Sequence, residues 1–127
     1  MRYRILSHRL IRIVLMVVME KAAIVKIAPD EARRILKCTC DRVKLRANAN
    51  EECFGGEIMD SLREAGVELG ANHFEILQTR SLLVRSMEAV GEEYPAALLQ
   101  DYVHRIPVST ALRFLDEAIV RTNGQEN

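Results

Sequence analysis

The chain has 127 residues, a length that corresponds to one compact domain or to one domain with a short helical tail. Apolar residues make up 49% and charged residues 28% of the sequence, so the chain can bury a core and is not disordered by composition. Aromatic residues make up only 5%, with 3 Pro and 6 Gly, which argues against a β-sandwich or β-barrel. The 3 cysteines, an odd number, do not form a secreted disulfide framework. We therefore expect an all-α cytoplasmic protein.

The net charge of zero hides an uneven distribution of charge along the chain. Residues 1–50 hold 12 Lys or Arg against 4 Asp or Glu, whereas residues 51–127 hold 6 against 14. This asymmetry indicates either a polyanionic partner for the first half or pairing between the two halves, and an ordinary solvated surface explains it equally well. Because affinity for nucleic acid grows with the number of phosphates neutralised, a neutral chain needs a partner to hold DNA tightly.

The first long predicted helix, residues 5–27, contains no breaker and is apolar around most of its circumference. Its apolar run is shorter than the roughly 20 residues of a membrane span, and no signal-peptide cleavage site follows it, so we expect no membrane partner. A helix that is apolar on several sides needs cover, from a second copy of the chain or from the rest of a bundle. We expect a homodimer with Val14, Val17 and Val18 at its interface.

Pro, Gly and Asn residues divide the rest of the chain into shorter predicted helices. Asn72 and Ser109 are the expected N-caps, and Gly66 and Gly124 are the expected stops. Gly91 marks a candidate hinge. The predicted helices cover residues 29–37, 41–47, 57–64, 72–90, 95–104 and 109–121.

The pair of helices within residues 57–90, joined by a short Gly-containing turn, forms either a helix-turn-helix DNA reader or an α-hairpin, which is the commoner arrangement. In its second helix, Phe74, Leu77, Leu82 and Val84 are the expected packing face. The remaining positions could reach phosphates or base edges, and the helix N-terminus favours phosphate. For His73 alone, a structural hydrogen bond is the favoured role. The candidate DNA-contacting residues are Asn72, His73, Gln78, Arg80 and Ser81.

The cysteines and histidines give only a weak signal for a metal. Cys38 and Cys40 with Cys53 and a histidine could supply four zinc ligands, but Cys-x-Cys is a weaker signal than Cys-x-x-Cys, so we expect free thiols and no metal. No base, nucleophile and orienting acid occur at a recognisable spacing. We expect no enzyme activity and no cofactor.

Several segments occur in the order seen in one known family. Leu6-Ser7 opens a long apolar helix that ends in Glu20-Lys21-Ala22. Val43-Lys44-Leu45 precedes an Asn-containing break and then Cys53-Phe54, and His73 precedes a helix rich in Ile and Leu. In this ordered set, over about residues 6–83, the chain resembles FlhD, the flagellar master-regulator subunit, and its relatives on conjugative elements. The family's Phe-Arg-Phe-Asp is here Phe54-Gly55-Gly56-Glu57, which removes an arginine and adds flexibility.

The resemblance implies an intertwined helical homodimer, with a dimerisation and DNA-contacting domain over residues 1–91 that includes a helix-turn-helix-like region. Residues 92–127, which have no counterpart in the family, would form a C-terminal helical extension. By position, Cys53 corresponds to a cysteine that can bridge the dimer, His73 falls in the DNA-contacting region, and Glu20 and Lys26 fall near the partner-contacting region.

The function that the resemblance implies is transcription activation by a heteromeric complex. An FlhC-like subunit would carry zinc and most of the DNA affinity, and the complex would bind promoter DNA and recruit RNA polymerase. The alternative is a helical adaptor or secretion-type chaperone that binds a protein segment and never touches DNA.

Overall fold

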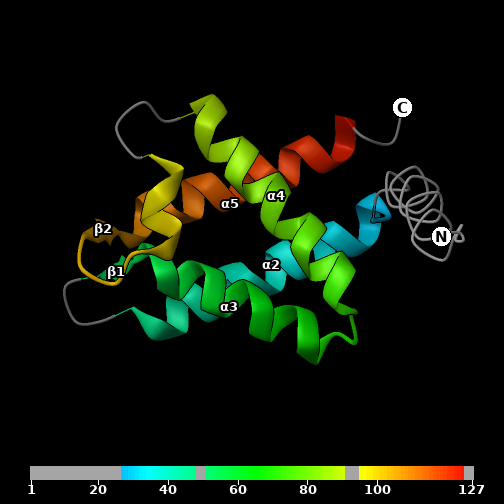
Figure 1. Ribbon diagram of the computed structural model, residues 1–127, viewed down its shortest axis with the longest axis horizontal. Coiled ribbons are helices and arrows are strands. Elements are labelled where there is room, and N and C mark those ends of the chain that lie inside the picture. The colour runs from blue at the N-terminus through cyan, green and yellow to red at the C-terminus, as the bar shows by residue number, and fades with distance from the viewer. Residues whose placement is uncertain (1–26, 48–50, 91–94, 125–127) are drawn as a thin grey trace, which may run out of the picture.

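The computed structural model describes residues 27–47, 51–90 and 95–124 (Figure 1). Most of these residues are helical, which confirms the all-α class in outline. The predicted dimer-interface residues Val14, Val17 and Val18, and the predicted partner contacts Glu20 and Lys26, lie outside the described residues. The elements are α2 (Pro29–Arg46), β1 (Glu52–Phe54), α3 (Gly55–Glu68), α4 (His73–Val90), the 3-10 helix η1 (Ala96–Gln100), β2 (Arg105–Pro107) and α5 (Val108–Gly124).

Helix α2 is one continuous helix, so the prediction of two helices divided near residue 40 is wrong. Pro29 lies in the first turn, where its missing N–H costs nothing. The buried Thr39 hydroxyl donates a hydrogen bond of 2.6 Å to the carbonyl oxygen of Ile35, one turn earlier. This bond lets a polar, β-branched residue lie inside the helix without an unsatisfied hydroxyl.

One hydrophobic core joins the helices, and α2 packs against both α3 and α5. Helix α4 crosses in front of α5 and α2 in Figure 1 and packs mainly against α5. The C-terminal helix, which the sequence assigned to an extension, contributes to this same core. The core includes Ile35, Leu36 and Val43 of α2, Ile58 and Leu62 of α3, Leu83 and Met87 of α4, and Phe114, Leu115 and Ala118 of α5.

The turn between α3 and α4 is set by residues on both sides of it. Gly66 does not end α3, as expected from sequence, but lies buried inside it, where an added Cβ would stand 2.5 Å from Cγ1 of Ile76. The helix ends instead near Gly70, whose φ of +82° suits glycine. Asn72 caps α4 as predicted: its Oδ1 accepts a hydrogen bond of 2.8 Å from the N–H of Glu75, and its own N–H donates one of 2.9 Å to Oε1 of Glu75.

Two short strands and η1 replace the irregular stretch around Cys53 and the helix predicted over residues 95–104. Strands β1 and β2 pair antiparallel with Cys53 opposite Ile106, and the N–H of Val108 donates 2.8 Å to the carbonyl oxygen of Glu51, which extends the ribbon. The N–H of Gly56 donates 2.8 Å to the carbonyl oxygen of Asp101, so η1 is held against the start of α3. Three-residue strands carry no period-2 signal, which is why the sequence did not predict them.

Candidate functional site

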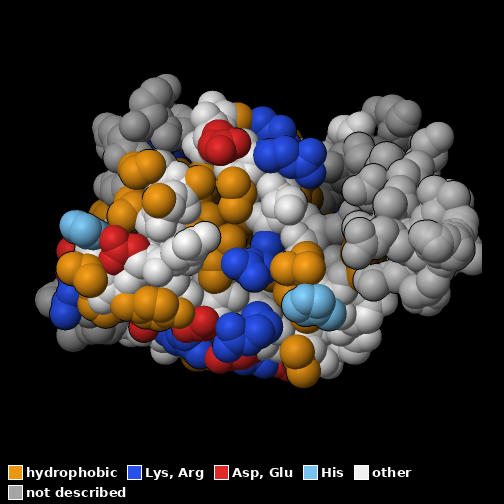
Figure 2. All heavy atoms as spheres, in the orientation of Figure 1, with side chains coloured by type: hydrophobic (Ala, Val, Ile, Leu, Met, Phe, Trp, Pro, Cys, Tyr) orange, Lys and Arg blue, Asp and Glu red, His pale blue; other side chains and the backbone are white. Residues whose placement is uncertain are grey.

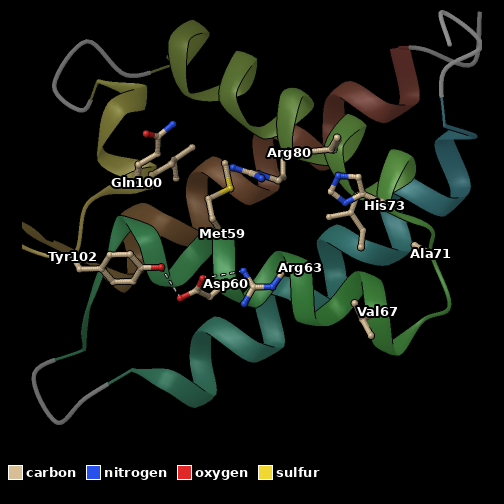
Figure 3. Close-up of a pocket in the computed structure, with 12 residues that line it drawn as sticks. Met59, Asp60, Arg63, Val67, Ala71, His73, Arg80, Gln100 and Tyr102 are labelled. Carbon is tan, nitrogen blue, oxygen red and sulfur yellow. Dashed lines mark hydrogen bonds and ion pairs between the residues drawn. The ribbon is translucent and has the colours of Figure 1, made fainter. Parts of the chain in front are cut away.

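The candidate site is a groove bounded by α3, α4 and η1, which we call the α3–α4–η1 groove (Figure 3). It consists of a hollow of about 460 Å³ that reaches from the α3–α4 turn to Tyr102, and a more open one of about 850 Å³ that follows α4 to Arg85. The two hollows are continuous because they share lining residues from all three elements. The shared residues are Met59, Leu77, Arg80, Leu99 and Gln100.

The groove has an apolar floor and an apolar side on α4. Met59 and Leu99 are 8% and 2% exposed and form the floor, whereas Leu77 of α4 is 40% exposed. The neighbouring Phe74 is 41% exposed. A space-filling view shows apolar side chains interspersed with basic ones over this face (Figure 2). The molecule therefore leaves a partly uncovered apolar surface here.

The predicted packing face of α4 is correct at Leu82, which is buried, and at Val84, which is partly buried against the core. It is wrong at Phe74 and Leu77, which are exposed. The buried face instead carries two polar residues, Thr79 and Ser86, beside apolar ones. Each of these hydroxyls donates a hydrogen bond of 2.8 Å to the carbonyl oxygen one turn earlier in α4. Because that bond satisfies the hydroxyl, a helix can turn its Thr and Ser inward and leave larger apolar residues outside.

Arg80 lies at the junction of the two hollows and extends from α4 toward Met59 in Figure 3. Its Nε is buried and has no hydrogen-bond partner among the described residues. The nearby Asp60, by contrast, accepts a hydrogen bond of 2.7 Å from the hydroxyl of Tyr102 and pairs with Arg63 at 3.3 Å. The hydrogen bond to Asp60 raises the pKa of Tyr102 above its usual value. The carboxylate in the groove is satisfied, and the Arg80 Nε is not.

The five predicted DNA-contacting residues divide into two groups. Asn72 is committed to capping α4, and Gln78 lines the groove while its Oε1 accepts a hydrogen bond from the N–H of Ile27. His73, Arg80 and Ser81 line the groove with side chains that have no such backbone role. The structure thus brings four of the five onto one groove, and Asn72 does not line it.

The cap also changes the expectation that phosphate would bind at the start of α4. The Glu75 carboxylate already occupies that end, where it hydrogen-bonds the N–H of Asn72. A second anion at this helix N-terminus would meet a like charge.

Cys53, the predicted bridging cysteine, is 3% exposed within β1. Burial and the nearby Glu57 carboxylate raise the pKa of its thiol to about 11. Burial and the Asp116 carboxylate do the same for Cys40. An interchain disulfide at Cys53 stays a prediction, and it requires β1 to open, because the thiol is enclosed by its own chain.

The sequence missed the residues that α3, η1 and the loop after η1 bring to the groove, among them Met59, Arg63, Leu99 and Tyr102. Leu99 and Tyr102 lie about forty positions from α3 in the sequence, so no local pattern joins them to it. The sequence feature that could have indicated this wall of the groove is the pair Gly55-Gly56. An added Cβ on Gly55 would overlap the carbonyl oxygen of Leu98, and one on Gly56 would overlap the ring of Tyr102. Two adjacent glycines at a helix start indicate such a close approach.

Comparison with known proteins gives no match: no family model, no curated protein and no solved structure matches the chain. Within residues 27–47, 51–90 and 95–124, no helix combines the length and the apolar character needed to cross a membrane. Over the same ranges, no three His, Cys, Asp or Glu side chains lie close enough together to hold a metal ion.

Proposed function

We propose that this chain is a non-enzymatic, cytoplasmic interaction subunit that binds an α-helical segment of a partner protein in the α3–α4–η1 groove. The observation that carries the proposal is the exposed apolar side chain of Leu77 on α4, beside the buried floor formed by Met59 and Leu99. An apolar groove between helices is the surface that receives the apolar face of an amphipathic helix. Methionine in the floor favours such a role because its side chain adapts to different partners.

The dimensions of the groove fit a short helix. Its lining on α4 extends from His73 to Arg85, which at 1.5 Å per residue corresponds to roughly 18 Å, or about three helical turns. A helix of that length presents anchors at positions i, i+4 and i+7. Both hollows would be filled by one such segment lying along α4.

A peptide selection tests this function. A displayed library of helix-forming peptides is selected on the full chain, and the enriched peptides are measured against Leu77→Gln and Leu45→Gln. Leu45 is a matched control because it is 85% exposed at the end of α2 and does not line the groove. We expect Leu77→Gln to weaken binding at least tenfold and Leu45→Gln to leave it unchanged. Equal binding by both variants, or no enrichment on the wild-type chain, would contradict the proposal.

The second candidate function is the one implied by the FlhD resemblance: a subunit of a transcription activator that binds promoter DNA together with an FlhC-like partner and recruits RNA polymerase. It is favoured by three arginines, Arg63, Arg80 and Arg85, that line the same groove as His73. Arginine side chains of this kind supply phosphate and base contacts. The Glu75 carboxylate at the start of α4 opposes it.

Arg80 separates the two functions. If the groove faces DNA, Arg80→Ala weakens promoter binding by the complex and reduces its salt slope by about one, without changing partner binding. If the groove holds a protein segment, Arg80→Ala weakens the protein complex itself. Co-expression of the chain with an FlhC-like subunit, followed by gel filtration and mobility shift on promoter fragments, distinguishes these results.

A further inference from the structure

We infer that the segment held in the α3–α4–η1 groove is an acidic amphipathic helix of a separate protein, with a carboxylate placed to pair with Arg80. The inference rests on the proposed function and goes further, since it names the chemistry of the partner.

The first argument is the incomplete environment of Arg80. Its Nε is buried without a hydrogen-bond partner, and it forms no ion pair with any described residue. A buried N–H that lacks an acceptor costs free energy, and more so when the group is charged. A carboxylate in the groove would accept two parallel hydrogen bonds from one guanidinium edge and remove that cost.

The second argument is the charge along the groove. Its lining holds three arginines, Arg63, Arg80 and Arg85, and one carboxylate, Asp60. Asp60 is already engaged by Arg63 and by Tyr102. Arg85 is exposed, and its Nε donates a hydrogen bond to the carbonyl oxygen of Ser81 in its own helix. The uncompensated charge of the groove is therefore positive, and it lies along α4.

The third argument excludes the chain's own segments as occupants. Residues 1–26 are apolar enough to fill a groove, but they hold six Lys or Arg and one Glu, so they would place like charges beside Arg80. A second copy that docked through the same face would bring its own excess of arginines against this one. A partner with carboxylates beside its apolar anchors meets neither difficulty.

The test compares two sets of peptides: those enriched on the full chain, and the same peptides with each Asp and Glu changed to Gln. Binding is measured by fluorescence anisotropy at two salt concentrations, with wild type, Arg80→Gln and Arg34→Gln. Arg34 is the control because it lies on α2, away from the groove, and pairs with Glu31 at 3.0 Å. We expect an excess of Asp and Glu in the enriched peptides and at least tenfold weaker binding by the Gln versions. Arg80→Gln should abolish that difference, and Arg34→Gln should preserve it.

Two other results overturn the inference, and they do so in different ways. If binding depends on Leu77 but the Gln versions bind as tightly as the acidic ones, the groove binds a protein segment and the acidic partner is wrong. If the enriched peptides are basic, the occupant is a segment such as residues 1–26 of the chain itself. If Leu77→Gln does not change peptide binding, the proposal that the α3–α4–η1 groove binds a protein segment is itself wrong.

Discussion

The two sides of this helical molecule differ in how much apolar surface they leave uncovered. Between α2 and α5, Phe114 is fully buried. Arg33 donates a hydrogen bond of 3.1 Å to the hydroxyl of Thr122 and one of 2.8 Å to Oδ1 of Asn123. Between α3, α4 and η1, Leu77 is 40% exposed and the buried Nε of Arg80 has no partner within the described chain. The first side serves stability. The second keeps apolar surface and charge available, as a binding surface must.

Truncation of one large side chain on each side gives the largest contrast. Phe114→Ala should lower the free energy of unfolding by about 3–5 kcal/mol, because it leaves a cavity where α5 meets the core. Leu77→Ala should lower it by less than about 1 kcal/mol, since that side chain is already partly in water. Urea denaturation of both variants measures the difference. A loss of similar size at Leu77 would show that the groove side is part of the core.

The partly buried thiol of Cys40 and the buried thiol of Cys53 give a second large effect. The pKa values of Cys40 and Cys53 are raised from 9.0 to about 11, so at pH 8 their thiolate fraction is about a hundredfold lower in the folded chain. We expect iodoacetamide to modify Cys40 and Cys53 at least about a hundredfold more slowly in the folded chain in buffer than in the chain unfolded by urea. Mass spectrometry measures the two rates. Rapid modification of folded Cys53 would instead indicate that β1 opens, as the interchain disulfide requires.

The same shifts fix the direction of a pH dependence. The folded chain holds these thiol protons more tightly than the unfolded chain does, because the pKa values are higher in the folded state. Their contribution to stability is therefore complete below pH 9 and is lost as the pH rises through about 11.

An added methyl group at Gly55 should affect the groove more than the core. Gly55→Ala places a Cβ against the carbonyl oxygen of Leu98, so η1 must move away from α3. We expect a loss of about 1–3 kcal/mol in unfolding free energy, together with weaker binding of groove-selected peptides. Gly124→Ala is the control, since nothing lies within 4 Å of its added Cβ. Peptide binding that survives Gly55→Ala unchanged would mean that η1 does not form a wall of the site.

The smallest predicted effect concerns the cap of α4. Asn72→Ala removes one half of the reciprocal bond pair with Glu75 and should cost about 1 kcal/mol. Because we assign Asn72 a structural role, peptide and promoter binding at temperatures well below unfolding should be unchanged. A specific loss of promoter binding in a fully folded Asn72→Ala protein would restore Asn72 as a DNA contact.

The parts of this structure that sequence predicted are those governed by local chemistry. Asn72 caps α4 because its side chain reaches an N–H three residues on. The expected N-cap Ser109 lies instead inside α5, which begins at Val108. Helix α2 was divided wrongly because the hydrogen bond of Thr39 to its own backbone could not be seen in the pattern. The same kind of bond satisfies the buried hydroxyls of Thr79 and Ser86, whereas Phe74 and Leu77, which the pattern assigned to the packing face, are exposed.

For the candidate site, sequence found the residues on α4 and missed the opposite wall. His73, Arg80 and Ser81 were named because they follow a helix start, and all three line the groove. Met59 and Tyr102 join them only through the contact of η1 with Gly55-Gly56, which is a property of the tertiary structure. The role assigned to these residues changed accordingly, from DNA contacts on one helix to the lining of a groove between three elements.

The most direct test of the central claim is hydrogen–deuterium exchange of the full chain with and without a saturating peptide enriched on it. Exchange reports local opening segment by segment, so it shows where the ligand stabilises the molecule. The account predicts increased protection in α3, α4 and η1, and no change in α5 beyond the turns that touch α4. Protection confined to α2 and α5, with α4 unchanged, would contradict the assignment of the α3–α4–η1 groove as the binding surface.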